Sequence, residues 1–455
     1  MASVNVNVKN VRLTHEGAPA SAIKPIEELK RSVMSCMLWE DSFYEDGVAI
    51  ADRVKELIGK VSQEEARNVL LDAKFNSKLR HMPLYLLVLF AGRGWLKKED
   101  VVKICTRADD MAELLALYWK DGKKPLCHQL IKGLAITIPV FNEYELAKYN
   151  RDKSIKLRDV FRIVRPVPQN ETQSALWKRV VANELAMPDT WEVAISACGS
   201  DNAKKAEEFS RLLAEKAVDK ETGKEFNKLG DLAFLRNLRN MRETGVDESL
   251  IRQSFNERSW KWIIPYQFIS AALNNPGFED VLEKAMFKCL GNEEVLGDKI
   301  ALLVDISASM CSSISRKSEL MRYDAAAGLA VLLREICTDI KLYAFNNRLY
   351  EIPPRRGFAL HEAITKNSGG GTNMWEAIRT AAKDRRNRVM IVITDEQTMD
   401  QGSYTDANSD LLVIINVDSY QNGVGYEKGV IHINGWSDSV INWLREYLNN
   451  EFVNC

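Results

Sequence analysis

Three short polar segments in the last third of the chain carry oxygen atoms suited to a hard divalent cation. The first is Asp305-Ile306-Ser307-Ala308-Ser309, the second is Gly369-Gly370-Gly371-Thr372-Asn373, and the third is Thr394-Asp395-Glu396. Two carboxylates and three hydroxyls are ligands of the kind that Mg²⁺ accepts, with water molecules completing its octahedral shell. Alternation within Asp-x-Ser-x-Ser points the three polar side chains inward from one tight loop.

These segments form the first predicted site, a magnesium site that binds rather than catalyses. Its predicted ligands are Asp305, Ser307, Ser309, Thr372 and Asp395. Thr372 is expected to bind directly or through water, and Asp395 through water, which leaves a coordination position open for a carboxylate of a partner. No general base stands beside the site, because His361 precedes the glycine-rich segment in an ordinary helix or loop. An ordinary cluster of polar loops without a metal is the alternative interpretation.

The segments that flank this site alternate between strand and helix patterns. Ile300–Val304 is an uninterrupted apolar run that ends at Asp305, as expected of a strand buried on both faces. Further strands are predicted at residues 340–345, 389–394, 411–416 and 430–433, and helices at residues 322–336, 374–382 and about 440–448. This alternation predicts a doubly wound α/β domain over residues 297–455. The loops beyond the carboxyl ends of its strands would bring the polar segments together.

Residues 26–290 have a different pattern. Apolar residues recur every three or four positions, in runs of about 10 to 20 residues, and segments of period two rich in Val and Ile are nearly absent. Glycines and prolines interrupt the runs at intervals compatible with stacked helical hairpins of the HEAT type. We therefore predict an all-α helical-repeat domain over residues 26–290. An N-terminal extension of residues 1–25 precedes it, and a boundary near residues 291–298 follows it.

The densest basic stretch of the chain lies between Leu146 and Pro168. As a helix, it would bury residues 157, 160, 161 and 164 and would place Arg158, Arg162 and Arg165 on a neighbouring ridge at i, i+4 and i+7, before Pro166 ends it. Guanidinium groups about 5 to 6 Å apart suit phosphates. Lys178 and Arg179, predicted to open the next helix, extend the path. The residues of this predicted phosphate-binding path are Lys156, Arg158, Arg162, Arg165, Lys178 and Arg179; a solvated charged face is the alternative.

The composition excludes several classes of protein. The chain has 455 residues with 62 Lys plus Arg against 63 Asp plus Glu, a balance that excludes coating nucleic acid by positive charge alone. No window offers the roughly 18 consecutive apolar residues of a membrane helix, and no signal peptide is evident. The 8 cysteines form no CxxC pair and join no histidine in a ligand-like cluster, so zinc is not expected. We expect a cytoplasmic protein.

Five motifs, in order along the chain, resemble those of TROVE-module proteins, the Ro autoantigen and its bacterial and phage-borne relatives. They lie at residues 37–47 (MLWEDSFYEDG), 78–84 (KLRHMPL), 141–149 (FNEYELAKY), 157–166 (LRDVFRIVRP) and 235–241 (LRNLRNM). The resemblance covers about residues 14–290. The metal segments resemble the metal-ion-dependent adhesion site of von Willebrand factor A domains, which completes the architecture of that family.

The resemblance implies a ring of HEAT-like repeats closed by the von Willebrand factor A domain. In that family the outer surface holds small noncoding Y RNAs, and the central hole admits single-stranded ends of misfolded RNAs. Some bacterial members work with an exoribonuclease in RNA quality control. Arg158 and Arg162 match the basic positions of the family's Leu-Arg-Asp-x-x-Arg helix, implicated in RNA contact. Many relatives have histidine where this chain has Arg165, which keeps a cation but loses a pH-tunable charge.

The resemblance therefore favours a scaffold without enzymatic activity, monomeric within a ribonucleoprotein and reaching a protein partner through its metal site. Two other functions stay open. One is a metal-dependent protein-interaction adaptor that binds no RNA, which the near-neutral charge favours. The other is a metal-dependent nuclease, which requires carboxylates converging on an ion with a nucleophilic water. The hydroxyl-rich ligand set and the missing base oppose the nuclease.

Overall fold

The computed structural model describes residues 12–218, 225–260, 263, 265–289, 296–316 and 318–435. The chain divides into two compact units, one of Val61–Leu229 and one that joins Met1–Lys60 to Gly230–Cys455. Residues 12–60 therefore belong to the unit that holds the sheet. None of the helices described is long and apolar enough to span a membrane.

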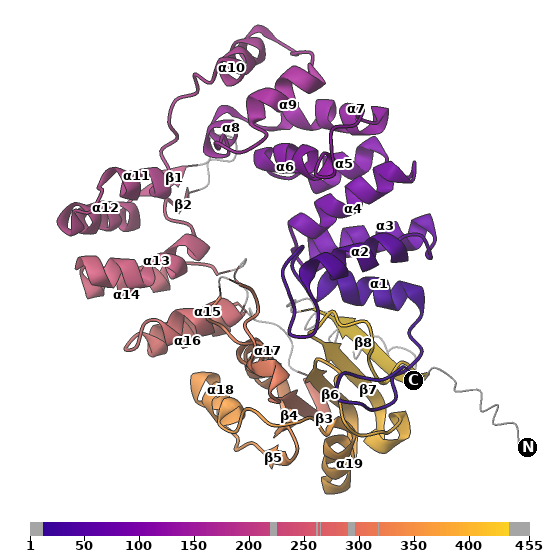
Figure 1. Ribbon diagram of the computed structural model, residues 1–455. Helices are drawn as coiled ribbons and strands as arrows, with labels where there is room; N and C mark the ends of the chain where they lie inside the picture. Colours follow the sequence, from indigo (N-terminus) through magenta and orange to yellow (C-terminus); the bar gives the residue numbers. More distant parts are fainter. Residues whose placement is uncertain are drawn as a thin grey trace, which may run out of the picture. The chain divides into compact units, whose positions relative to one another are not determined.

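The unit of residues 61–229 is built from short helices that pack on near neighbours in the sequence (Figure 1), as α4 does on α6, α5 on α7, and α9 on α6 and α10. Its helices are α3 (Gln63–Leu71), the π-helical η1 (Asp72–Asn76), α4 (His81–Gly92), α5 (Lys98–Ile104), α6 (Ala108–Tyr118), α7 (His128–Thr137), the 3-10 turn η2 (Ile138–Val140), α8 (Glu143–Lys148), α9 (Leu157–Val164), α10 (Glu171–Ala182), α11 (Trp191–Ala197) and α12 (Asn202–Ala214). The predicted helical repeats are confirmed. A short antiparallel hairpin, β1 (Lys216–Val218) with β2 (Glu225–Asn227), was not predicted.

Among its described residues, the other unit has six further helices outside its α/β part. They are α1 (Pro25–Met34), α2 (Gly47–Leu57), α13 (Asp231–Thr244), α14 (Glu248–Asn256), α15 (Pro265–Leu273) and α16 (Glu279–Lys288). Helix α1 packs on α2 and on the last strand, and α15 and α16 pack on helices of the α/β part. The change from helices to sheet falls between α16 and β3, close to the predicted boundary. The compact units do not divide there, because these helices share buried surface with the α/β part.

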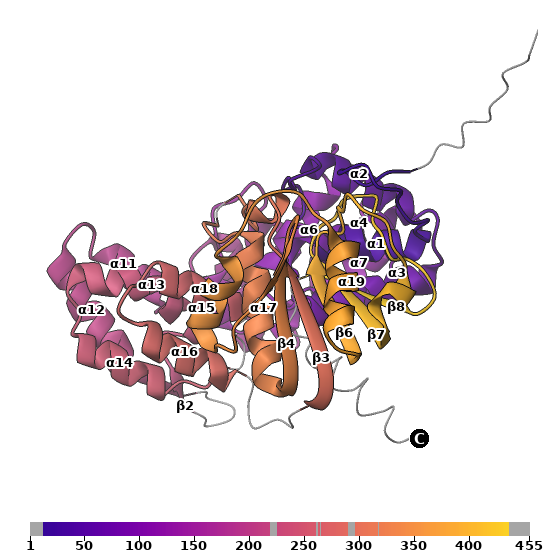
Figure 2. The ribbon, with the colours of Figure 1, turned by 90° about the horizontal axis from the view of Figure 1, so that it is seen from below.

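The α/β part is a six-stranded sheet in the order β5-β4-β3-β6-β7-β8, in which only β4 and β5 pair antiparallel. Figure 2 shows its central strands side by side. The strands are β3 (Leu296–Asp305), β4 (Cys337–Phe345), β5 (Leu349–Glu351), β6 (Asn387–Thr394), β7 (Ser409–Asn416) and β8 (Val430–Asn434). The helices are α17 (Arg322–Ile336), α18 (Gly357–Thr365) and α19 (Met374–Asp384), with 3-10 turns η3 (Ser309–Cys311) and η4 (Tyr404–Ala407).

This topology confirms the predicted doubly wound, mostly parallel sheet. Each predicted strand is present, and the short edge strand β5 was not predicted. The helix predicted at about residues 440–448 lies outside the described residues.

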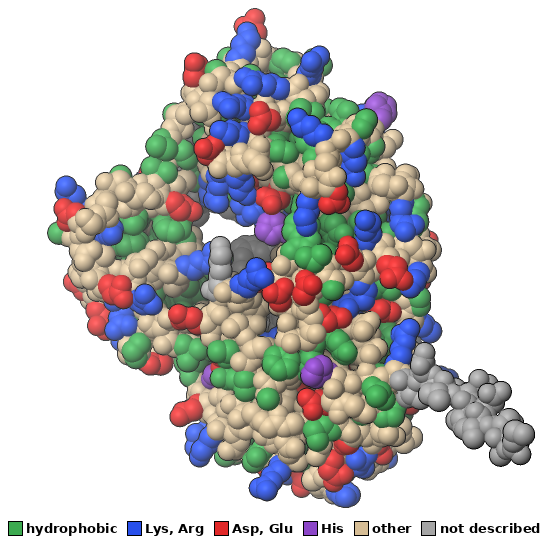
Figure 3. All heavy atoms as spheres, in the orientation of Figure 1, with side chains coloured by type: hydrophobic (Ala, Val, Ile, Leu, Met, Phe, Trp, Pro, Cys, Tyr) green, Lys and Arg blue, Asp and Glu red, His purple; other side chains and the backbone are tan. Residues whose placement is uncertain are grey.

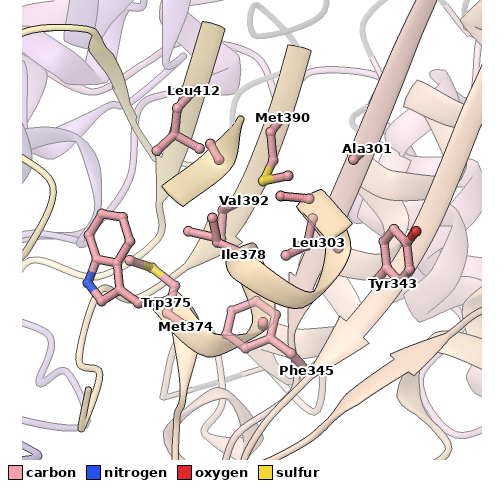
Figure 4. Close-up of a cluster of buried hydrophobic side chains, with 14 of the residues drawn as sticks. Ala301, Leu303, Tyr343, Phe345, Met374, Trp375, Ile378, Met390, Val392 and Leu412 are labelled. Atoms are coloured by element: carbon pink, nitrogen blue, oxygen red, sulfur yellow. The ribbon is translucent and has the colours of Figure 1, made fainter. Parts of the chain in front are cut away.

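The core of the sheet explains its apolar strands. On one face, Ala301 and Leu303 of β3 pack with Met390 and Val392 of β6 against Ile378 of α19 (Figure 4). The alternate residues of β3 are also fully buried, so both faces of this strand are covered. Strand β3 has β4 on one side and β6 on the other, the position at which the strand order reverses. The carboxyl ends of β3 and β6 therefore border the crevice in which such sheets bind ligands.

Candidate functional site

The first predicted metal segment begins where β3 ends. Asp305 is fully buried; its Oδ1 accepts a hydrogen bond from the Ser307 amide at 2.9 Å, and its Oδ2 accepts one from the Thr394 hydroxyl at 2.6 Å. The hydroxyl oxygens of Ser307 and Ser309 lie 3.3 Å apart. The first and third segments, 89 residues apart in sequence, therefore meet at the carboxyl ends of adjacent strands.

Main-chain hydrogen bonds hold the glycine-rich segment against the other two. The Ala308 amide donates to the Gly370 carbonyl at 2.9 Å, and the Gly369 amide donates to the Ile306 carbonyl at 2.7 Å. On the other side, the Thr372 carbonyl accepts from the Met399 amide at 2.8 Å. Gly369 and Gly370 adopt φ values of 107° and 84°, a region that favours glycine. The structure thus brings all three predicted segments together around the buried Thr372.

Asp395 has a contact that sequence reasoning missed. Its Oδ1 accepts from the Gln397 amide at 3.1 Å, and its Oδ2 accepts from the Tyr44 hydroxyl at 2.7 Å. The Ser309 hydroxyl acts on both groups by lowering their pKa values, against the larger effect of burial. Tyr44 lies in the loop before α2, inside the first motif of the TROVE resemblance, and that motif is the signal that could have drawn attention to it.

The charges around the site leave a net negative balance. Burial, and then the Asp395 carboxylate, raise the pKa of Asp305 to about 7. Burial, with the nearby Asp418, raises the pKa of Asp395. Arg322 is buried and forms an ion pair with Asp418. With all three carboxylates ionised and one guanidinium present, a divalent cation would neutralise the remaining charge.

The donor set therefore fits a hard cation such as Mg²⁺. In the part of the chain that the structure describes, no three His, Cys, Asp or Glu side chains converge as a ligand group. A cation held by Asp305 and Asp395 would therefore also depend on the hydroxyls of Ser307, Ser309 and Thr372, as the sequence pattern predicts.

Glu396, the last residue of the third segment, has a different role. It adopts φ 63° and is fully buried. Its carboxylate pairs with Arg31 of α1 and lies 3.0 Å from Nδ1 of His432 on β8. Glu396 therefore connects helix α1 to the sheet, and its carboxylate already has Arg31 and His432 as partners.

Helix α9 carries part of the basic strip, which is the predicted phosphate-binding path of Lys156, Arg158, Arg162, Arg165, Lys178 and Arg179. Leu157, Val160, Phe161 and Val164 are buried, as the apolar stripe predicts. The helix ends at Val164, and Arg165 adopts φ 50° as its C-cap residue, so the expectation of a third helical position at Arg165 was wrong. The ring of Pro166 disfavours helical geometry in the residue before it. The Arg165 guanidinium instead turns back, its Nε lying 3.4 Å from the Arg162 carbonyl oxygen.

Ion pairs separate the six predicted residues into two groups. Lys156 pairs with Asp152, and Arg179 makes a bidentate pair with Glu143 at 2.5 and 2.8 Å. Arg158 lies 4.0 Å from Asp159. No described carboxylate lies within ion-pair distance of the remaining three, which are Arg162, Arg165 and Lys178. Lys178 and Arg179 lie in the second half of α10, so the prediction that they open this helix was wrong.

The three cations without a described carboxylate partner border one hollow of about 420 Å³ between α9 and α10. Figure 3 shows Lys and Arg side chains gathered over this part of the unit. The hollow is also lined by Phe161 and Trp177, whose rings pack edge to face at 5.7 Å. Trp177 is 6 % exposed, and its Nε1 has no hydrogen-bond acceptor in the described structure. The hollow thus offers positive charge and a buried donor.

A second polar hollow, of about 620 Å³, lies in the other unit between α13, α15 and residues 314, 315 and 318–320. Arg236 and Arg239 line it, and Arg239 pairs with Glu243 at 3.1 Å. Asn275 is 2 % exposed and donates from Nδ2 to the Ala271 carbonyl, which leaves its Oδ1 without a donor in the described structure.

A protein of known structure has a fold similar to that of this chain. No family model matches the sequence, and no curated protein matches it. The chain is similar to the crystal structure of the Ro (RSR) protein of Deinococcus radiodurans, with a TM-score of 0.58 and 19 % identity over 92 % of this chain and 98 % of that one. A membrane protein of Bacteroides fragilis aligns over 26 % of this chain with a TM-score of 0.22, from which nothing follows. The chain has the fold of a Ro protein.

Proposed function

We propose that this chain, which has the fold of a Ro protein, is an RNA-binding scaffold. The observation that carries the proposal is the hollow between α9 and α10, where Arg162, Arg165 and Lys178 surround an unpartnered buried indole N–H. RNA phosphates would neutralise the three cations, and a phosphate or base oxygen would accept from Trp177 Nε1. The five sequence motifs that resemble TROVE modules support the same assignment.

We further assign the finer roles from that resemblance. A small noncoding, Y-like RNA would bind at the α9–α10 hollow. Unpaired ends of misfolded RNA would bind the second hollow, where Arg236 and Arg239 offer charge and Asn275 Oδ1 offers an acceptor. Such a protein would act without catalysis in RNA quality control, as a monomer within a ribonucleoprotein. Its metal site would recruit an exoribonuclease or another protein.

A magnesium site would supply the link to a protein partner. Asp305, Ser307, Ser309, Thr372 and Asp395 would hold the ion. When bound, it would offset the excess negative charge and attract an acidic side chain. The alternative function, a protein-interaction adaptor that binds no RNA, would use the same metal site. The two functions differ only in whether α9 and α10 bind RNA.

The triple variant Arg162→Ala/Arg165→Ala/Lys178→Ala tests the RNA interface. We expect its affinity for a fluorescein-labelled stem–loop RNA with an unpaired tail to fall about tenfold at low salt, because three phosphate contacts are lost. The slope of log affinity against log salt should become shallower by about 2 to 3. Fluorescence anisotropy at several salt concentrations measures both quantities.

The matched control is the double variant Lys156→Ala/Arg179→Ala, which removes two cations of the same strip that already have carboxylate partners. Its RNA affinity should stay within about twofold of the wild type. Equal losses in both variants would mean that the strip acts through its overall charge rather than through the hollow. If the wild-type chain binds no RNA, the adaptor without RNA becomes the better function.

Trp177→Phe tests the unpartnered donor separately. Phenylalanine keeps the ring that packs on Phe161 and removes the indole N–H, so RNA affinity should fall about fivefold through the loss of one hydrogen bond. Far-ultraviolet circular dichroism should be unchanged. An RNA affinity equal to that of the wild type would show that the ligand does not reach Nε1.

A further inference from the structure

The predicted metal site was expected to leave a coordination position open for a partner's carboxylate, but a residue of this chain contacts one of its predicted ligands. The Tyr44 hydroxyl donates to Asp395 Oδ2, the carboxylate oxygen that the Gln397 amide does not use. Tyr44 thus contacts the predicted ligand Asp395 from a part of the chain 351 residues away.

Aromatic packing holds the phenol in this place. The Tyr44 ring lies 4.7 Å from the His15 ring, 5.0 Å from the Phe43 ring and 5.3 Å from the Tyr420 ring, centroid to centroid. Burial, and then the Asp395 carboxylate, raise the pKa of Tyr44. The three neighbouring rings hold the Tyr44 hydroxyl against Asp395.

The loop that carries Tyr44 has a defined conformation. The Gly47 amide donates to Asp41 Oδ1 at 2.9 Å, and a Cβ atom at Gly47 would lie 2.4 Å from the backbone carbon of Trp39. Glycine is therefore needed where this loop folds back onto the start of α2. At the other end of the loop, Glu45 pairs with Arg53, which also donates to the Ser419 carbonyl.

The outer edge of the loop is held only by exposed groups. Asp41 pairs with Arg316 at 2.8 Å, and these side chains are 48 % and 67 % exposed. Phe43 is 51 % exposed. An exposed ion pair contributes little to stability, so the outer edge adds little resistance to movement of residues 40–46. The Glu45–Arg53 pair, whose side chains are 12 % and 11 % exposed, must also break before these residues leave the site.

We propose that Tyr44 is the resident ligand of the candidate metal site, so that an external carboxylate reaches the site only when residues 40–46 lift away. This inference rests on the metal site proposed above. It makes the loop a competitor of the acidic partner: a partner must displace Tyr44 from Asp395, and the segment with the first TROVE-like motif then becomes free.

The experiment uses the full chain, Mn²⁺ as the metal and acetate as the carboxylate. Water-proton relaxation measures Mn²⁺ binding, and acetate that enters the metal shell lowers the relaxation enhancement by displacing water. Tyr44→Phe removes the hydroxyl and keeps the ring. We expect Tyr44→Phe to bind acetate about tenfold more tightly than the wild type, since one charge-assisted hydrogen bond no longer competes.

Tyr420→Phe is the matched control, because it changes a phenol in the same ring cluster and leaves the Tyr44 bond to Asp395 in place. Its acetate affinity should equal that of the wild type. If both proteins bind Mn²⁺ and Tyr44→Phe has the same acetate affinity as the wild type, the proposed role of Tyr44 is overturned while the metal site stands. No Mn²⁺ binding by either protein would overturn the metal site and this inference together.

Discussion

Replacing Arg31 with methionine will lower the free energy of unfolding by about 3–5 kcal/mol, because it leaves a buried carboxylate without its main partner. Arg31 and Glu396 are both fully buried and form an ion pair. The same guanidinium donates to the Tyr420 carbonyl at 2.5 Å, the Asn422 carbonyl at 3.1 Å and the Tyr426 hydroxyl at 3.0 Å. One side chain of α1 thus satisfies four acceptors of the α/β part.

Urea unfolding followed by circular dichroism measures this loss. The double variant Arg31→Met/Glu396→Gln should recover part of it, since the buried charge is then removed as well. Lys30→Met is the control, because the neighbouring Lys30 pairs with Glu27 at the surface and its loss should cost less than about 1 kcal/mol. A loss below about 1 kcal/mol in Arg31→Met would show that the pair is not what fastens α1 to the sheet.

Saturating Mg²⁺ will raise the stability of the wild-type chain by about 2.7 kcal/mol when its concentration is a hundred times the dissociation constant, because the ion binds the folded site only. Chelation with EDTA will reverse the gain. The physical reason is the burial of Asp305 and Asp395 together, which is unfavourable without a cation. Thermal unfolding in EDTA and in Mg²⁺ measures the difference.

Asp305→Asn provides the decisive comparison for the metal. The amide removes one buried charge, so this variant should unfold in EDTA at or above the temperature of the wild type and should not respond to Mg²⁺. Asp384→Asn, at a surface carboxylate that pairs with Lys341, should keep the full response. A wild-type chain that does not respond to Mg²⁺ would favour the alternative of polar loops without a metal.

The sequence by itself determined the α/β architecture and the composition of the candidate metal site. Strands buried on both faces must be apolar throughout, so β3, β6 and β7 are visible as uninterrupted runs. The predicted helix at residues 322–336 coincides with α17. Parallel topology then requires the segments after β3 and β6 to meet at one edge of the sheet, which is why Asp305 and Asp395 could be assigned to one site before any contact was known.

Local sequence patterns could also predict part of the basic strip. The buried stripe of α9 follows from a period of 3.6 residues. Pro166 could have shown that Arg165 leaves the helix, since the restriction on the residue before proline is a local one. Local patterns could not predict that Arg179 pairs with Glu143, which lies 36 residues earlier.

Only the tertiary structure decided which charged and polar groups have partners. Arg31 finds Glu396 across 365 residues, and Tyr44 finds Asp395 across 351. Neither pair leaves a periodic or local signal in the sequence. Each contact forms because elements that are distant in the sequence pack against each other and bring the two side chains together. The residue types of the candidate metal site could therefore be predicted from the sequence. The contact of Tyr44 with Asp395 and the cluster of Arg162, Arg165 and Lys178 depended on how the elements pack.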